Sequence, residues 1–149
     1  MLAIACDHGA VALKKELETV LTEMGVEYRD YGTDSEESVD YPVYAEKAAR
    51  AVASGECDRG IVLCGTGLGV SLAANKVRGI RCALCGDCYS ARMSRAHNNA
   101  NMLAMGARVV GAELAKMIMR TWLATDFEGG RHARRVAMID TLDQGGTLL

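Results

Sequence analysis

The stretch that most restricts how this chain can fold is Cys64-Gly-Thr-Gly-Leu-Gly69, which follows an apolar run at residues 60–63. Residues 70–76 after it have the pattern of a helix. A buried strand that runs through a glycine-rich turn into a helix is typical of α/β proteins, whose ligands bind at the carboxyl ends of parallel strands. Glycines let the backbone approach a ligand, and a helix start offers unpaired N–H groups to an anion. The stretch therefore predicts an anion site that contains one cysteine, Cys64.

The rest of the chain alternates between short apolar runs and amphipathic segments. Strands are predicted at residues 2–6, 26–31, 60–63, 80–84 and 102–105, and helices at 11–24, 42–54, 70–76, 88–97, 113–123 and 131–142. This alternation favours a parallel sheet with helices on both faces. We therefore expect one domain over residues 1–149, a Rossmann-like three-layer α/β/α sandwich with a mainly five-stranded parallel sheet and a frayed tail at 145–149. On the helix at 113–123 the buried side is expected to carry four residues, Leu114, Met117, Ile118 and Trp122.

Composition excludes several functional classes. The 149 residues suffice for a sizeable core, and no apolar run approaches the ~20 residues that span a bilayer. The first residues lack the basic and small-residue features of a signal peptide. The net charge is −2 with mixed signs, which gives no basic surface for nucleic acid. We expect a cytoplasmic protein with neither membrane nor nucleic-acid partners.

The six cysteines do not indicate a disulfide framework, because the chain is too apolar and too helical for a small stapled scaffold. Cys6 and Cys82 fall in apolar strands and are expected to behave as small hydrophobic residues. Cys82, Cys85 and Cys88 lie three residues apart, but three thiols alone do not complete a tetrahedral zinc site. We expect that arrangement to be incidental.

Buried cysteines are usually inert, and this is the alternative for Cys64. At a glycine-rich helix entrance, however, the same donors that would hold an anion favour the thiolate, which can act as a nucleophile or a general base. Low-molecular-weight cysteine phosphatases use such a loop but require an arginine six residues after the cysteine, where this chain has Val70. The glycine spacing also misses the dinucleotide-binding and P-loop patterns. These functions are thereby disfavoured.

Two further segments are expected at the same sheet edge as Cys64: Asp7-His8, after the first strand, and residues 85–98. Asp7 could simply cap the next helix, a role compatible with chemistry. His97 and Asn98 could supply an acid and an amide, although a histidine at a helix end is more often a terminal cation.

Arginines could supply phosphate binding. Arg131 and Arg135 are four residues apart and share one helix face, and Arg108 is a third candidate. Converging guanidinium groups bind phosphate oxygens bidentately, whereas the alternative is a solvated helix face, as expected for Arg134. His132 is expected on the surface.

Together these residues resemble the B-type ribose-5-phosphate isomerase family, which also includes galactose-6-phosphate isomerase subunits. The similar segments are Cys6-Asp-His-Gly9, Asp40-Tyr-Pro42, Cys64-Gly-Thr-Gly67, Ala73-Ala-Asn-Lys76, Gly79-Ile-Arg81, Ser94-Arg-Ala-His-Asn98, Arg108-Val-Val-Gly111 and Glu128-Gly-Gly-Arg-His132. They extend from near residue 3 to about 140. Some members of the family use a glutamate just after the glycine loop in place of the cysteine; Val70 stands there, so this chain resembles the cysteine type.

The resemblance implies an aldose–ketose isomerase of the pentose phosphate pathway that works through a cis-enediolate, without metal or organic cofactor. By matching position, Cys64 moves the proton between C1 and C2, Thr66 assists between the substrate oxygens, and His97 with Asp7 opens the furanose ring. The implied sugar-binding residues are Asp7, His8, Tyr41, Gly65, Thr66, Gly67, Leu68, Gly69 and Asn98. The implied phosphate-binding residues are His8, Arg108, Arg131 and Arg135.

Members of this family are dimers or higher assemblies with shared sites, so the resemblance implies a homodimer or a dimer of dimers. The helix at about 131–143 is expected to reach the neighbouring subunit with the stripe Val136, Ile139 and Leu142, although docking on its own domain would give the same pattern. Two other functions remain open: isomerisation of a six-carbon sugar phosphate (allose or galactose 6-phosphate), and sugar-phosphate binding without catalysis.

Overall fold

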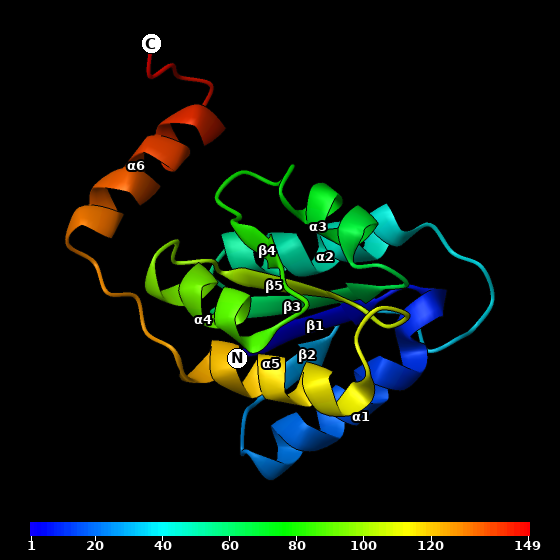
Figure 1. Cartoon of the computed structure of the whole chain (residues 1–149). Helices are drawn as coiled ribbons and strands as arrows, with labels where there is room; N and C mark the ends of the chain where they lie inside the picture. The colour runs from blue at the N-terminus through cyan, green and yellow to red at the C-terminus, as the bar shows by residue number, and fades with distance from the viewer.

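The computed structural model describes all 149 residues and contains one five-stranded parallel sheet (Figure 1). The strands are β1 (Leu2–Cys6), β2 (Tyr28–Asp30), β3 (Arg59–Cys64), β4 (Cys82–Leu84) and β5 (Met102–Gly106), in the spatial order β2-β1-β3-β5-β4. The helices are α1 (Val11–Glu23), α2 (Tyr41–Ala53), α3 (Leu68–Ala74), α4 (Cys88–Ala96), α5 (Ala112–Ala124) and α6 (Arg131–Asp143), with a short 3₁₀ turn, η1 (His8–Ala10). The predicted α/β sandwich is confirmed.

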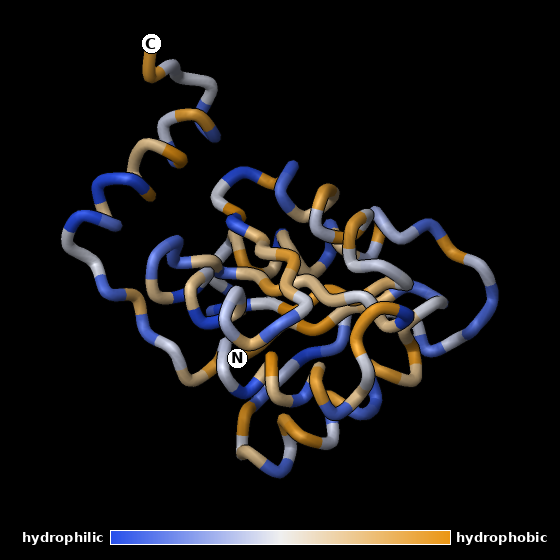
Figure 2. Tube along the Cα trace, viewed as in Figure 1, coloured by the Kyte–Doolittle hydropathy of each residue, from blue (hydrophilic) through white to orange (hydrophobic).

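Helices cover both faces of the sheet, with α2 and α3 on one side and α1, α4 and α5 on the other (Figure 1). The central strands β1, β3 and β5 are buried along almost their whole length, because each has a neighbour on both sides. Apolar residues dominate the trace through the sheet (Figure 2). The edge strands β2 and β4 are three residues each, shorter than predicted, since only one neighbour extends their pairing.

Local sequence signals explain several element boundaries. Asp87 caps α4, because its carboxylate accepts a hydrogen bond from the Ser90 N–H at 2.7 Å. Pro42 lies in the first turn of α2, where a missing N–H costs nothing. None of the helices is both long and apolar enough to cross a membrane.

The buried side of α5 differs from the prediction. Ile118 and Trp122 are fully buried as expected, but Leu114 is 38% and Met117 is 58% exposed. The other buried positions are Ala115 and Met119. The observed set has the spacing of one helix face, and the two exposed residues lie beside that face rather than on it.

Helix α6 projects away from the sandwich and ends near the C-terminus at a distance from the other helices (Figure 1). Of its residues only His132 and Val136 are buried. Ile139 is 42% and Leu142 is 52% exposed. Within one chain the predicted apolar stripe is therefore largely uncovered.

Candidate active site

The predicted anion site lies where β1, β3 and β5 end. Cys64, the last residue of β3, is 5% exposed, and its Sγ accepts a hydrogen bond from the Gly67 N–H at 3.1 Å. The N–H groups of Gly65, Thr66 and Gly69 find no acceptor within the chain. The turn therefore offers a sulfur atom together with free backbone donors, as the sequence predicted.

Close packing explains why this turn consists of glycines. Gly67 has φ +78°, and a Cβ there would lie 2.6 Å from the Leu84 side chain and 2.8 Å from the Met105 backbone. A Cβ on Gly106 would meet the backbone of Thr66 at 2.5 Å. A larger residue at either position would displace the turn and its donors.

Arg108, a candidate phosphate-binding residue of the sequence, lies at this edge. Its backbone N–H donates to the Gly65 carbonyl at 2.9 Å, and its guanidinium lies 3.3 Å from where a Gly65 Cβ would stand. It is also close to Gly9, is exposed, and has no carboxylate partner. Arg108 therefore leaves an uncompensated positive charge beside the glycine turn.

Asp7 and His8 lie next to the same turn. The Asp7 backbone N–H donates to the Leu63 carbonyl at 3.1 Å, and its carboxylate caps η1 by accepting the Gly9 N–H at 2.9 Å. The cap predicted for Asp7 is confirmed. His8 Nδ1 accepts the Val39 N–H at 3.1 Å, so a neutral His8 carries its proton on Nε2 and offers a donor there.

A buried lysine holds the loop that contacts His8. Lys14 is fully buried, pairs with Asp30, and donates to the Asp34 carboxylate and the Thr33 carbonyl, each at 2.9 Å. Desolvation favours a lower pKa for Lys14, but the bonds to Asp30 and Asp34 outweigh it and the pKa is raised. The same contact lowers the pKa of Asp34. No local sequence signal indicates this anchor, because a lysine on an amphipathic helix has the pattern of a surface residue.

Three of the other cysteines have thiols that are affected by burial. Burial raises the pKa of the Cys6 thiol to about 12, that of Cys82 to about 12 and that of Cys85 to about 11, so these thiols remain protonated at neutral pH. Cys88 is half-buried at the start of α4. None of these cysteines belongs to the one group of potential metal ligands that the structure brings together.

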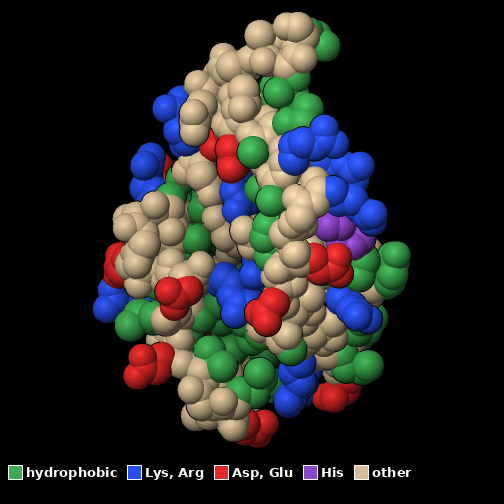
Figure 3. Space-filling view, turned by 90° about the vertical axis from the view of Figure 1, so that its left-hand side faces the viewer, with side chains coloured by type: hydrophobic (Ala, Val, Ile, Leu, Met, Phe, Trp, Pro, Cys, Tyr) green, Lys and Arg blue, Asp and Glu red, His purple; other side chains and the backbone are tan.

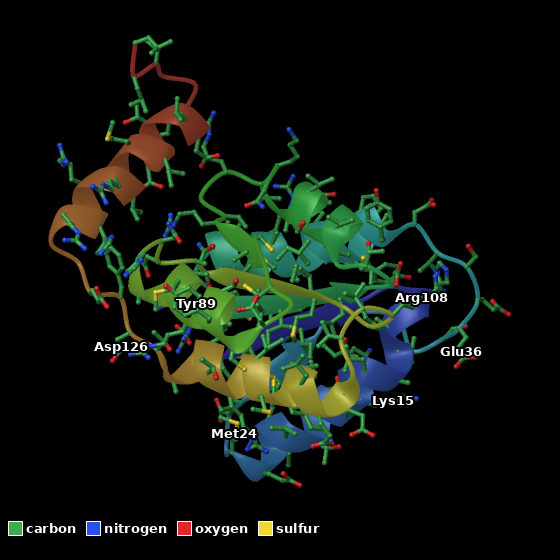
Figure 4. All side chains as sticks on the ribbon, viewed as in Figure 1. Lys15, Met24, Glu36, Tyr89, Arg108 and Asp126 are labelled. Atoms are coloured by element: carbon green, nitrogen blue, oxygen red, sulfur yellow. The ribbon has the colours of Figure 1, made fainter.

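His97 and Asn98 lie at the opposite edge of the sheet, and the predicted convergence of residues 85–98 on the Cys64 edge is wrong for these two. The chain leaves β4 at its carboxyl end, returns along α4, and reaches His97 before β5 begins at Met102. The next residues contact the start of β4, where the Arg81 side chain donates to the Asn99 carbonyl at 3.2 Å. In Figure 4, Arg108 and Asp126, which lies in the segment leading to α6, stand on opposite sides of the molecule.

His97 is paired with His132, whose predicted surface location is wrong. The two imidazole rings stack with centroids 4.1 Å apart and planes 8° from parallel. The Glu128 Oε2 lies 3.8 Å from His97 Nε2 and 3.6 Å from His132 Nε2. His132 is 8% exposed, and desolvation, followed by the charges of His97 and Arg131, lowers its pKa.

Buried contacts fix this second edge to the sandwich. The Arg95 guanidinium donates to the Ala100 carbonyl at 2.7 Å and to the Thr125 carbonyl at 3.3 Å. The Glu128 N–H donates to the Ala96 carbonyl at 3.0 Å. The turn that carries His97 and the segment that leads into α6 are therefore held together.

Helix α6 presents positive charge and an apolar surface. Arg131 and Arg135 are exposed and have no carboxylate partner, and histidine side chains stand beside Lys and Arg side chains on this face of the molecule (Figure 3). A cavity of about 440 Å³ lies between α6 and the β4 side of the sandwich, which are joined by the Arg81–Asp140 ion pair at 3.1 Å. Its lining includes Ile80, Arg81, Asn98, Ile139 and Leu142.

Comparisons with known proteins cover nearly the whole chain. A model of the Ribose/Galactose Isomerase family matches residues 2–139. "Ribose-5-phosphate isomerase B" of Escherichia coli (strain K12) is 54% identical over 143 residues, which are 96% of each chain. The solved ribose-5-phosphate isomerase B of Clostridium thermocellum is 56% identical, covers 97% of each chain and has a TM-score of 0.95. "D-erythrulose-4-phosphate isomerase" of Pectobacterium atrosepticum is 46% identical and covers 93% of this chain and 91% of its own.

Proposed function

The chain belongs to the ribose/galactose isomerase family, and from this premise we propose that it interconverts D-ribose 5-phosphate and D-ribulose 5-phosphate. The identity to proteins of that name runs along almost the full length of both chains, so the whole domain, rather than one motif, supports the assignment. All six cysteines are free, which suits a cytoplasmic reaction of the pentose phosphate pathway.

The observation that carries the proposal is the contact between Cys64 Sγ and the Gly67 N–H at the end of β3. In the proposed reaction the Cys64 thiolate removes the C2 proton of the open-chain aldose, a C1–C2 double bond forms, and O1 becomes negative. The thiol returns its proton to C1, O2 loses its proton, and the C2 carbonyl forms. Thr66, whose hydroxyl lies in the same turn, assists proton movement between O2 and O1.

The free amides of the turn would stabilise the enediolate. Donors of Gly65, Thr66 and Gly69 gain strength as negative charge develops on the substrate oxygen, so they lower the barrier more than they tighten substrate binding. One such donor typically contributes ~3 kcal/mol. No charged side chain is required for this step.

The remaining groups at this edge suit the sugar and its phosphate. Arg108 supplies an unpaired guanidinium, and His8 offers the Nε2–H that the Val39 contact leaves free. The Tyr41 ring packs over Gly69, where a Cβ would lie 2.6 Å from it, and Leu68 is exposed beside it. We assign these residues to substrate binding, with Asp7 taking part in ring opening.

We further propose that a second copy of the chain completes each site. His97, Asn98, Arg131 and Arg135 are assigned to ring opening and to phosphate and sugar binding, yet they lie at the other edge of their own chain. The exposed apolar residues of α6 support its docking on a neighbour. In a symmetric dimer, α6 of each copy would lie against the Cys64 edge of the other copy, and two equal sites would result.

A direct assay of ribose 5-phosphate and ribulose 5-phosphate interconversion tests the function. We expect kcat/KM for ribose 5-phosphate to exceed that for allose 6-phosphate, galactose 6-phosphate and D-erythrulose 4-phosphate. A higher value for one of the other sugars would reassign the substrate while leaving the chemistry intact. Binding of these sugars without turnover would instead identify a non-catalytic module.

A further inference from the structure

The stacked histidines and Glu128 form a cluster that the proposed reaction does not fully use. Only His97 has a catalytic assignment; His132 and Glu128 have none. The three ligand atoms lie within 4.8 Å of one another, and both Nε2 atoms stand near the same carboxylate oxygen. A carboxylate and two imidazoles form a set that binds Zn²⁺ with a fourth position left for water.

We propose that His97, Glu128 and His132 form a binding site for one Zn²⁺-like divalent cation, and that the bound cation withdraws His97 from the reaction. The second part rests on the proposed function, because it requires His97 to act in ring opening. The first part depends only on the ligand geometry of the chain.

Coordination requires the two imidazole rings to leave their stacked arrangement. Zn–N and Zn–O bonds of about 2 Å place the ligand atoms of a tetrahedral site roughly 3.3 Å apart. The distances of 3.8 and 3.6 Å to Glu128 Oε2 must therefore shorten slightly, and the parallel rings must open into a V so that the metal lies in both ring planes. His132 is enclosed, whereas the His97 and Glu128 side chains are 37% and 58% exposed and have room to turn.

Neighbouring charges limit the affinity of the site for a cation. His132 is enclosed, so its imidazole is the fixed member of the set. Arg131 and Arg135 on the same helix repel a cation, and Glu128 supplies a single negative charge. We therefore expect binding weaker than at a structural zinc site, with metal that exchanges with the solvent.

The first test is titration of the full-length protein with Zn²⁺ in competition with a chromophoric chelator. We expect one site per chain and a dissociation constant raised by at least about 100-fold in His132→Phe, because a ligand is lost while a flat ring still stacks on His97. Glu128→Gln should have the same effect, and its exposed position leaves folding unaffected. An unchanged dissociation constant in both variants would overturn the site.

Thiols are the main alternative ligands, so Cys88→Ser serves as the matched control. It should bind Zn²⁺ like the wild type. Substitution by Co²⁺ gives a second reading: nitrogen and oxygen ligands produce visible d–d bands without the near-ultraviolet thiolate charge-transfer band. A strong thiolate band, lost in Cys88→Ser and retained in His132→Phe, would overturn the proposal in favour of a cysteine site.

Activity separates the two parts. Zn²⁺ should inhibit the wild type over the concentration range in which it binds, and a chelator should restore the rate. His132→Phe should keep its basal rate and resist Zn²⁺. Zn²⁺ binding that is lost in His132→Phe but does not inhibit the wild type would support the site and contradict the ring-opening role of His97, which belongs to the proposed function.

Discussion

The two edges of the sheet hold their functional groups in different ways. At the carboxyl edge, Cys64 and the glycine turn are fixed by backbone contacts, and substitution of Gly67 or Gly106 would collide with main-chain atoms. At the opposite edge, the groups are side chains on a turn and on a projecting helix, and Arg131 and Arg135 extend into solvent. One half of the proposed site is therefore preformed, and the other half consists of exposed side chains.

This difference suggests how catalysis and assembly are linked. In the proposed mechanism the donors that stabilise the enediolate must not move, which suits a turn that the sheet holds rigidly. In the proposed dimer the groups on α6 reach a second molecule, which suits an element that its own chain covers poorly. An isolated chain would then bind phosphate weakly and lack the residues for ring opening.

The largest expected effect comes from removing the Cys64 thiol at the carboxyl edge of the sheet. Cys64→Ala should lower kcat by ~10³-fold, because loss of a positioned general base removes most proton transfer. Inorganic phosphate, measured as a competitive ligand by calorimetry, should bind with unchanged affinity. Cys88→Ser is the control and should keep full activity; a Cys64→Ala variant that still turned over substrate would remove the cysteine from the mechanism.

The second prediction tests whether the two edges of each proposed site come from two different copies of the chain. Cys64→Ala and His97→Ala chains, co-expressed with different tags and purified as doubly tagged dimers, should recover about half of the wild-type rate, because one of two symmetric sites is intact. The matched control pairs Cys64→Ala with Asp7→Asn, whose defects lie at the same edge, and no site is then intact. Equal rates in the two mixtures would show that each site is made by one chain.

A third experiment tests the exposed arginines of α6 alone. Replacing both Arg131 and Arg135 by alanine should raise KM for ribose 5-phosphate by about 100-fold, because each charge-assisted hydrogen bond to phosphate is worth ~1.5 kcal/mol or more. The turnover number should change little, since neither guanidinium touches the reacting carbons. Arg134→Ala on the same helix should leave KM unaltered. An equal rise in KM in that variant would indicate a general charge effect.

The fourth prediction concerns the anchor of the preformed edge. Lys14→Met should lower the free energy of unfolding by about 1.5–3 kcal/mol, because the charge-assisted hydrogen bonds that the buried ammonium donates to Asp30 and Asp34 are lost. Urea denaturation measures this loss. Lys15→Met, at an exposed neighbouring position, should have almost no effect. If the two variants were equally stable, Lys14 would not be the anchor of this loop.

The smallest effect is a dependence on acid pH. The pKa of Asp34 is lower in the folded chain than in the unfolded chain, so its contribution to stability is present above about pH 4 and disappears as the pH falls through the lowered value. Between about pH 5 and pH 3 the melting temperature of the wild type should therefore fall more than that of Lys14→Met. Parallel curves would mean that the pair contributes no pH dependence.

Much of the fold could be predicted from local sequence signals. The strand, turn and helix around Cys64, the cap at Asp87 and the extent of α6 depend on neighbouring residues, and the structure agrees with them. The orientation of α5 was predicted less well: Leu114 and Met117 are apolar but exposed. In a helix with many apolar residues, hydropathy does not decide which of them face the sheet, because this depends on how the helix packs.

The candidate site likewise contains features that the sequence predicts and features that it does not. The composition of the turn was sufficient to predict Cys64 with its donors, and the order of strands and helices could have indicated that His97 lies at the other edge, since a helix that follows a parallel strand returns to the amino end of the next strand. The burial of His132 and Lys14 had no such signal. Each is polar in an amphipathic segment, and its partners are distant in sequence.

The sequence by itself determined the sandwich, the reactive turn and the family resemblance, because strand runs, glycines and caps act over a few neighbouring residues. Only the tertiary structure decided which groups meet: Lys14 with Asp34, His97 with His132, and Arg108 with Gly65. It also separated Cys64 from His97 within one chain. Contacts between distant segments depend on the packing of the whole chain, and no local pattern encodes them.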